Sequence, residues 1–219
     1  VKKIGINMSF VEKIDLANLP SFSKNKSYLA IVERKALKGS NIFFKKLILE
    51  PFSASGQLSK KSSLSDIQNI LDKKVSYSLK NNIFYTNWVK DMSKVCNIFC
   101  DIMESNTISF SLGTSRGCTR YHLDNVPIRL LVTYFGQGTE WLPFNAANYK
   151  AYFKGQKNES IIKKTTERKF IKTWDIATFR GGTEGILHRT PDSALKSPSL
   201  QMRLDHSSYL KNIEKFYFN

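Results

Sequence analysis

The hydrophobic pattern of this chain changes its period near residue 107, and that change constrains the fold most. Over residues 83–104 the apolar side chains recur three and four positions apart, as they do along one face of a helix. After residue 107 they instead form short runs separated by turn residues, which is typical of strands. Helices followed by strands predict an α+β fold, in which a helical layer packs on an antiparallel sandwich or barrel.

Residues 1–106 are expected to be mainly helical and integral to the fold. Residues 27–34 predict a short strand or one helical turn, and residues 41–49 predict a short helix. Residues 53–63 are rich in serine and lysine and predict a loop. A helix should follow over residues 65–74, where a serine N-cap precedes acidic and amide side chains.

Residues 107–219 are expected to form the β part of the molecule. The expected strands lie at residues 107–112, 121–124, 128–135, 171–179, 185–190 and 199–205. The two runs on either side of the glycine-rich turn at residues 180–185 predict a hairpin. Residues 155–169 are highly charged and predict an exposed loop or hairpin inserted between strands.

Composition limits the class of protein. The 219 residues are enough for one domain with its own core, and no apolar run approaches the ~18 residues that a membrane span needs. The first residues lack the continuous apolar segment of a secretory signal, although the chain begins with Val1 rather than Met, so the true start can lie upstream. Three cysteines fit a reducing compartment, so we expect a cytoplasmic protein.

The chain is strongly basic, with a formal net charge of +16. Residues 1–110 and 111–219 each hold 17 basic and 9 acidic side chains, so the charge is evenly spread. It allows a polyanion partner such as nucleic acid, but an even spread favours a solvated surface. Arginine is more localised, because seven of the eight arginines lie after residue 115. This concentration predicts either an anion site or structural ion pairs.

Three side chains of the β part are typical metal ligands. His122 and Asp124 are two positions apart, so on an extended segment they share a face. His188 follows the glycine-rich turn later in the chain. Two histidines and one carboxylate form the facial triad that binds non-haem iron on one side and leaves the other side open. We therefore expect His122, Asp124 and His188 to be the metal-binding and catalytic group.

Arg203 lies on the last expected strand, where polar and apolar residues alternate. Leu200, Met202 and Leu204 would occupy one face, and Gln201, Arg203 and Asp205 the other. The polar face either lines the interior of a barrel, where Arg203 would hold a carboxylate, or faces water on an edge strand.

Taken in order, His122-x-Asp124, His188 and Arg203 resemble the double-stranded β-helix of iron(II)- and 2-oxoglutarate-dependent oxygenases. Longer blocks resemble a bacterial family catalogued as domain of unknown function 1826. The blocks are CTRYHLD at residues 118–124, RLLVTY at 129–134, GTEWLP at 138–143 and HRTP at 188–191. The resemblance covers about residues 107–206, and the N-terminal half resembles the family only in general layout.

The resemblance implies a cupin-like or jelly-roll barrel and metal-binding region over residues 107–219. It also implies a non-haem iron oxygenase, a 2-oxoglutarate-dependent hydroxylase or demethylase of unknown substrate. The three metal ligands would bind iron(II), and Arg203 would pair with the far carboxylate of 2-oxoglutarate. Tyr134 or Thr133 would supply a hydroxyl partner for that carboxylate.

Zinc is the alternative metal. The family is associated with metal-homeostasis gene neighbourhoods, including zinc-starvation GTPases, so the resemblance also allows a non-catalytic zinc-binding accessory protein. Cys118 would then complete a set of four ligands, although a lone cysteine is more often a small buried apolar residue. Glu140 is a further candidate ligand or base. A basic nucleic-acid-binding module is the third hypothesis.

The remaining candidates are expected to be structural. Cys96 and Cys100 lie one turn apart among apolar residues of the predicted helix and should belong to the core. His206 should lie on the surface or behind the metal ligands. Trp141 and Trp174 should form core or pocket wall.

Overall fold

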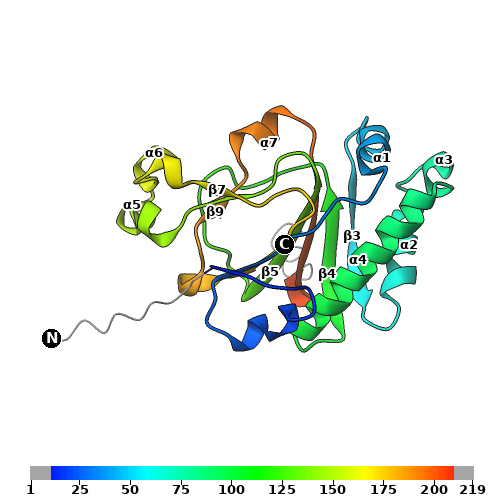
Figure 1. Cartoon of the computed structure of the whole chain (residues 1–219), viewed down its shortest axis with the longest axis horizontal. Coiled ribbons are helices and arrows are strands. Elements are labelled where there is room, and N and C mark those ends of the chain that lie inside the picture. Colours follow the sequence, from blue (N-terminus) through cyan, green and yellow to red (C-terminus); the bar gives the residue numbers. More distant parts are fainter. Residues whose placement is uncertain (1–10, 210–219) are drawn as a thin grey trace, which may run out of the picture.

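Helix α4 (Ile83–Ile102) is the longest helix in the structure, a computed structural model that describes residues 11–209. It begins after Asn82, whose side-chain oxygen accepts a hydrogen bond from the Phe84 N–H at 2.8 Å. Its apolar face is buried, as the sequence period predicts. Figure 1 shows it in a helical layer on one side of the molecule with α1 (Ser40–Leu47), α2 (Ser63–Asp72) and α3 (Tyr77–Lys80).

A seven-stranded sheet packs against this helical layer. Its strand order is β1-β2-β8-β5-β10-β4-β3, and every neighbouring pair is antiparallel except β1 with β2. The strands are β1 (Val11–Lys13), β2 (Leu29–Val32), β3 (Ser53–Ser59), β4 (Thr107–Gly113), β5 (Ile128–Phe135), β8 (Ile176–Arg180) and β10 (Leu200–His206). The fold is therefore a mixed α+β fold with a large, mainly antiparallel sheet.

Residues 11–106 are mainly helical, as expected, but they also contribute three strands of this sheet, β1, β2 and β3. The loop predicted at residues 53–63 is wrong, because β3 pairs with β4 along its whole length. Serine-rich composition hid the strand. Its small residues let α2 pack closely, since a Cβ on Gly56 would lie 2.6 Å from Cδ1 of Ile70. The large sheet therefore takes strands from both sides of residue 106.

A second sheet lies on the side of the molecule away from α1–α4, near the short helices that follow it in Figure 1. Its three strands, in the order β7-β6-β9, are β7 (Lys169–Phe170), β6 (Glu140–Trp141) and β9 (His188–Arg189). The hairpin predicted over residues 171–190 is wrong, because β8 pairs with β2 and β5 whereas β9 pairs with β6. The charged insertion at residues 155–169 contains α6 (Asn158–Ile161) and a 3-10 turn rather than a hairpin.

Alternation along β5 and β10 separates two faces of the large sheet. One set of side chains packs with the helices in the main core: Leu130, Val132, Tyr134, Leu200, Met202 and Leu204. The intervening set faces the other way: Arg129, Leu131, Thr133, Gln201, Arg203 and Asp205. A second apolar cluster joins Leu131 and Phe179 to Trp141, so the small sheet covers part of this second face.

Short helices complete the described chain. They are η1 (Leu19–Lys24), η2 (Phe144–Ala146), α5 (Tyr149–Phe153), η3 (Thr165–Glu167), η4 (Gly182–Glu184) and α7 (Asp192–Lys196). Cys96, Cys100, Trp141 and Trp174 are all buried, as expected for core or wall residues. Among residues 11–209, no helix is both long enough and apolar enough to cross a membrane.

Candidate metal centre

His122 and His188 face each other across a single β-bridge. The strand expected at residues 121–124 does not form, but His122 pairs alone with the first residue of β9. Its N–H donates to the His188 carbonyl at 3.0 Å, and the His188 N–H donates back to the His122 carbonyl at 3.1 Å. This mutual bonding puts both side chains on one side, with ring centroids 4.5 Å apart.

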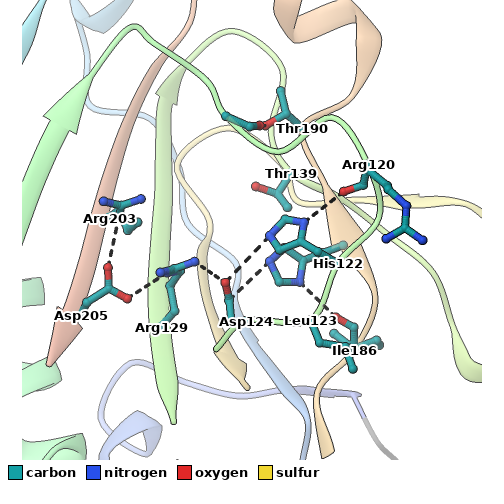
Figure 2. Close-up of polar contacts among 12 residues, drawn as sticks. Arg120, His122, Leu123, Asp124, Arg129, Thr139, Ile186, Thr190, Arg203 and Asp205 are labelled. Atoms are coloured by element: carbon teal, nitrogen blue, oxygen red, sulfur yellow. Dashed lines mark hydrogen bonds and ion pairs between the residues drawn. The ribbon is translucent and has the colours of Figure 1, made fainter. Parts of the chain in front are cut away.

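Asp124 completes the group from the same loop as His122. Its Oδ1 lies 3.9 Å from Nε2 of His122, and its Oδ2 lies 3.4 Å from Nε2 of His188. One ligand atom from each of the three residues lies within 4.8 Å of the other two. The structure thus brings together the three side chains that the sequence suggests as metal ligands, and Figure 2 shows Asp124 pointing toward the imidazole of His122.

Backbone carbonyls fix the protonation of both imidazole rings. Nδ1 of His122 lies 3.1 Å from the Arg120 carbonyl, and Nδ1 of His188 lies 3.0 Å from the Ile186 carbonyl. Because a carbonyl can only accept, each Nδ1 carries a hydrogen, so Nε2 is the nitrogen of each ring that can ligate a cation. Burial, together with the neighbouring imidazole, lowers the pKa of His122 to about 4, so this ring is neutral at pH 7.

Asp124 is a buried, ionised carboxylate. Burial by itself raises its pKa, but the nearby histidines and Arg129 outweigh this effect and lower the pKa to about 2. Nη1 of Arg129 donates to Oδ1, whereas Oδ2 is buried without a hydrogen-bond partner. An unpartnered carboxylate oxygen beside two imidazole lone pairs fits a bound divalent cation, and the donor set is one that iron(II) accepts.

A line of alternating charges leads from Asp124 to Arg203 (Figure 2). Nε of Arg129 donates to Oδ1 of Asp205 at 2.8 Å, and Oδ2 of Asp205 lies 3.1 Å from Nε of Arg203. Burial raises the pKa of Asp205, although Arg129 opposes the shift. The Arg203 side chain is 34% exposed, so this end of the line is open to solutes.

A pocket of about 80 Å³ opens beside the ligands. Its walls are Gly117, Cys118, His122, Arg129, Leu131, Thr139, His188, Arg189, Thr190, Gln201 and Arg203. A second hollow of about 170 Å³ shares Gln201 and Arg203 with it and is lined by Ser111 and other serines. Ser111 lies directly opposite Arg203 in the β4–β10 ladder, so its hydroxyl shares a face with that guanidinium.

The structure does not bring Tyr134 to this pocket, which corrects the expectation that it partners a cosubstrate. Its ring is buried in the main core, and its hydroxyl donates to Oδ2 of Asp91 at 3.1 Å. Strand parity explains the placement, because Tyr134 lies an odd number of residues from Arg129. Thr133 shares the face of Arg129, but its hydroxyl accepts from Gln201 at 3.1 Å and stands behind the pocket wall.

Glu140 is not available as a ligand or base. Its side chain is buried, accepts from the Tyr121 hydroxyl and lies 3.1 Å from Nε of Arg189. Cys118 is exposed on the pocket wall, which corrects the expectation of a buried residue, and it does not join the cluster of convergent ligand atoms. His206 is half-buried, and its Nδ1 lies 2.9 Å from the Ser208 hydroxyl.

Sequence reasoning placed Gln201 and Asp205 on the polar face with Arg203, but it missed four other polar residues near the site: Arg129, Thr139, Thr190 and Ser111. The signal for Arg129 was present, because it is the one charged residue of the largely apolar strand β5. A charge at such a position needs a buried partner. Ser111 gave no comparable signal, because serine is ordinary on either face of a strand.

The chain matches one family model in sequence and several solved structures in fold. A family model described as "Protein of unknown function (DUF1826)" matches residues 14–205, in agreement with the resemblance of the sequence blocks. No curated protein matches the chain significantly. Three solved structures illustrate the structural matches. A bsmA homolog from Methylobium petroleophilum PM1 has a TM-score of 0.46 and 10% identity, over 90% of this chain and 95% of its own.

The second is the Fe(II)/α-ketoglutarate-dependent dioxygenase TqaL, with a TM-score of 0.45 and 10% identity over 87% of this chain and 85% of its own. The third is a full-length protein from Neurospora crassa, solved in complex with α-ketoglutarate. It has a TM-score of 0.38 and 10% identity, over 94% of this chain and 88% of its own.

Proposed function

The chain belongs to the family described as protein of unknown function DUF1826, and we propose that it is an iron(II)-binding oxygenase that uses 2-oxoglutarate. One observation carries the proposal: the Nε2 atoms of two histidines on a pocket wall converge on a buried carboxylate oxygen of Asp124 that has no hydrogen-bond partner. This is the ligand set of the facial triad. The reaction would be hydroxylation or demethylation of a substrate that these residues do not identify.

The two sheets would be the walls of a double-stranded β-helix. Support comes from the apolar cluster that joins Leu131 and Phe179 of the large sheet to Trp141 of the small one. Between the sheets lie the polar face of β5 and β10 and the histidine on β9. A ligand site between two such walls is the arrangement that jelly-roll barrels offer.

Each residue of the site then has a role. His122, Asp124 and His188 hold iron(II), which together with 2-oxoglutarate supplies the activation of dioxygen. Arg203 binds the far carboxylate of the cosubstrate, because its guanidinium can donate two parallel hydrogen bonds. Ser111, rather than Tyr134, is the hydroxyl beside it. Phe179 packs on the ring of His188, with centroids 4.4 Å apart, and shields that imidazole from water.

The test uses the whole chain under anaerobic conditions. Iron(II) and 2-oxoglutarate are added to metal-free protein, and we expect a weak visible charge-transfer band. Admission of air should then give succinate without added substrate. His206→Gln serves as the matched control, because it changes a histidine outside the pocket. Absence of both the band and succinate from the wild-type protein would reject the proposal.

Zinc is the alternative metal, and a substitution of Cys118 distinguishes zinc binding from iron binding. A closed structural zinc site has four protein ligands, whereas the facial triad needs three. Metal analysis of protein from cells grown with and without added zinc would compare the wild type with Cys118→Ser. Retained zinc that the substitution lowers would favour zinc binding, and iron retained by both proteins would favour the oxygenase.

A further inference from the structure

Arg129 lies between two buried carboxylates on the polar face of β5. Its Nη1 donates to Oδ1 of Asp124, and its Nε donates to Oδ1 of Asp205 at 2.8 Å. The Arg129 side chain is only 12% exposed, and both carboxylates are almost completely buried. The guanidinium is therefore held at both ends and has little freedom to leave Asp124.

This contact makes the two oxygens of Asp124 unequal. Oδ1 is occupied by Arg129, whereas Oδ2 is buried without a hydrogen-bond partner and lies 3.4 Å from Nε2 of His188. A carboxylate in this state offers one oxygen to a cation. A free carboxylate can offer two oxygens, as carboxylate ligands often do.

We propose that Arg129 is a positioning residue that restricts Asp124 to metal ligation through Oδ2 alone. The inference rests on the proposed metal centre. With one oxygen from Asp124 and one nitrogen from each histidine, the protein supplies three ligand atoms and leaves the other positions on the metal for small molecules. Arg129 thereby keeps the centre open rather than saturated by protein.

Arg129 has a second role when no metal is bound. Asp124 and Asp205 are ionisable groups with almost no contact with water, and a buried carboxylate without a cation destabilises the fold strongly. The guanidinium neutralises both. Removal of Arg129 should therefore weaken the metal-free protein more than the metal-bound protein, because a bound metal replaces the lost charge at Asp124.

Cobalt(II) is a suitable probe, because its visible absorption reports the number and geometry of its ligands. We would compare the wild type with Arg129→Gln, Arg129→Lys and the control Arg180→Gln. Arg180 is also a half-buried arginine at a strand end, but it donates to the carbonyls of Phe22, Asn25 and Ser27, away from the pocket.

Arg129→Gln should change the cobalt spectrum and lower the unfolding temperature of the metal-free protein by roughly 10 °C. The rise in that temperature on adding cobalt should exceed the rise in the wild type. Arg129→Lys, which keeps the charge, should restore part of both properties, and Arg180→Gln should keep the wild-type spectrum. A wild-type spectrum and an unchanged cobalt-induced rise in Arg129→Gln would overturn the proposal and leave Arg129 a purely structural residue.

A measurement on the wild type avoids dependence on variants that fail to fold. Infrared difference spectra with ¹³C-carboxyl aspartate, recorded with and without cobalt, report how a carboxylate binds. A wide separation of the symmetric and antisymmetric stretches indicates ligation through one oxygen, and a narrow separation, which indicates two, would overturn the proposal. If the wild type binds no divalent metal, the proposed function fails and this inference fails with it.

Discussion

The two faces of the seven-stranded sheet are built from the same strands but have opposite chemistry. On the helix side, Met202 and its neighbours pack against α4 in an apolar core. On the other side, Arg203 and its neighbours form a line of charges that ends at Asp124. Along β10, residues that pack in the core therefore alternate with residues on the side of the candidate site. The difference teaches that strand parity, not position along the sequence, decides which residues belong to the site.

The largest expected effect comes from removing a ligand on the site side. His188→Ala should weaken iron(II) binding by more than about 100-fold, because even outer partners of metal ligands contribute 10–100-fold. Isothermal titration under anaerobic conditions would measure it. The control His206→Ala should bind as the wild type does, and equal loss in both variants would contradict the assignment.

The next largest expected effect is a loss of stability without a loss of metal affinity, from a substitution on the helix side of the sheet. Met202→Ala removes a fully buried side chain from the main core and should lower the free energy of unfolding by about 2–5 kcal/mol. Urea denaturation measures the loss. Affinity for iron(II) should stay at the wild-type value, since Met202 does not line the pocket. A parallel loss of metal affinity would show that the two faces are not independent.

The substitution Arg203→Met tests the opposite face of β10, one residue after Met202. It removes a charged donor for a carboxylate, so affinity for 2-oxoglutarate should fall about 10–100-fold, as expected for hydrogen bonds to a charged group. Fluorescence titration of the metal-loaded protein would measure this. Stability should change less than in Met202→Ala, because the Arg203 side chain is one-third exposed. Unaltered affinity would remove Arg203 from the site.

The smallest expected effect is on the reactivity of the cysteines. Cys96 and Cys100 lie in the core on the helix side, and Cys118 lies on the pocket wall. Burial raises the pKa of Cys100 to about 11 and that of Cys96 well above its usual range, so both stay as unreactive thiols near pH 8. Cys118 is exposed. A disulfide reagent should therefore titrate one thiol in the native protein and three after unfolding. Fast reaction of a second native thiol would show that α4 opens readily.

Much of the β part could be predicted from sequence, because hydrophobic period is a local property. The strands around Arg129 and Arg203 and the helix at Ile83–Ile102 follow it directly. The strand β3 could not be found this way, since its pairing with β4 is non-local and its serines are typical of loops. The polyanion-binding, cytoplasmic and nucleic-acid expectations stay predictions.

The three candidate ligands of the site could be predicted from the sequence, but the residues that position them could not. His122, Asp124 and His188 were found because two histidines and a carboxylate in this order on strand-like segments are typical of a metal site. The choice of Tyr134 was wrong, because it followed a conspicuous hydroxyl instead of the alternation that starts at Arg129. The pairing of His122 with His188 depends on backbone contacts between distant segments, which no local pattern encodes.

That pairing has a dynamic consequence. The amide hydrogen of each candidate ligand histidine is hydrogen-bonded to the carbonyl of the other, so a cation bound by both rings would also hold the two backbone segments together. Exchange of these two amides with deuterium should then slow on metal loading, whereas amides in the middle of α4 should exchange at the same rate in both states. The exchange rate of the His122 and His188 amides would therefore report whether the site holds a metal.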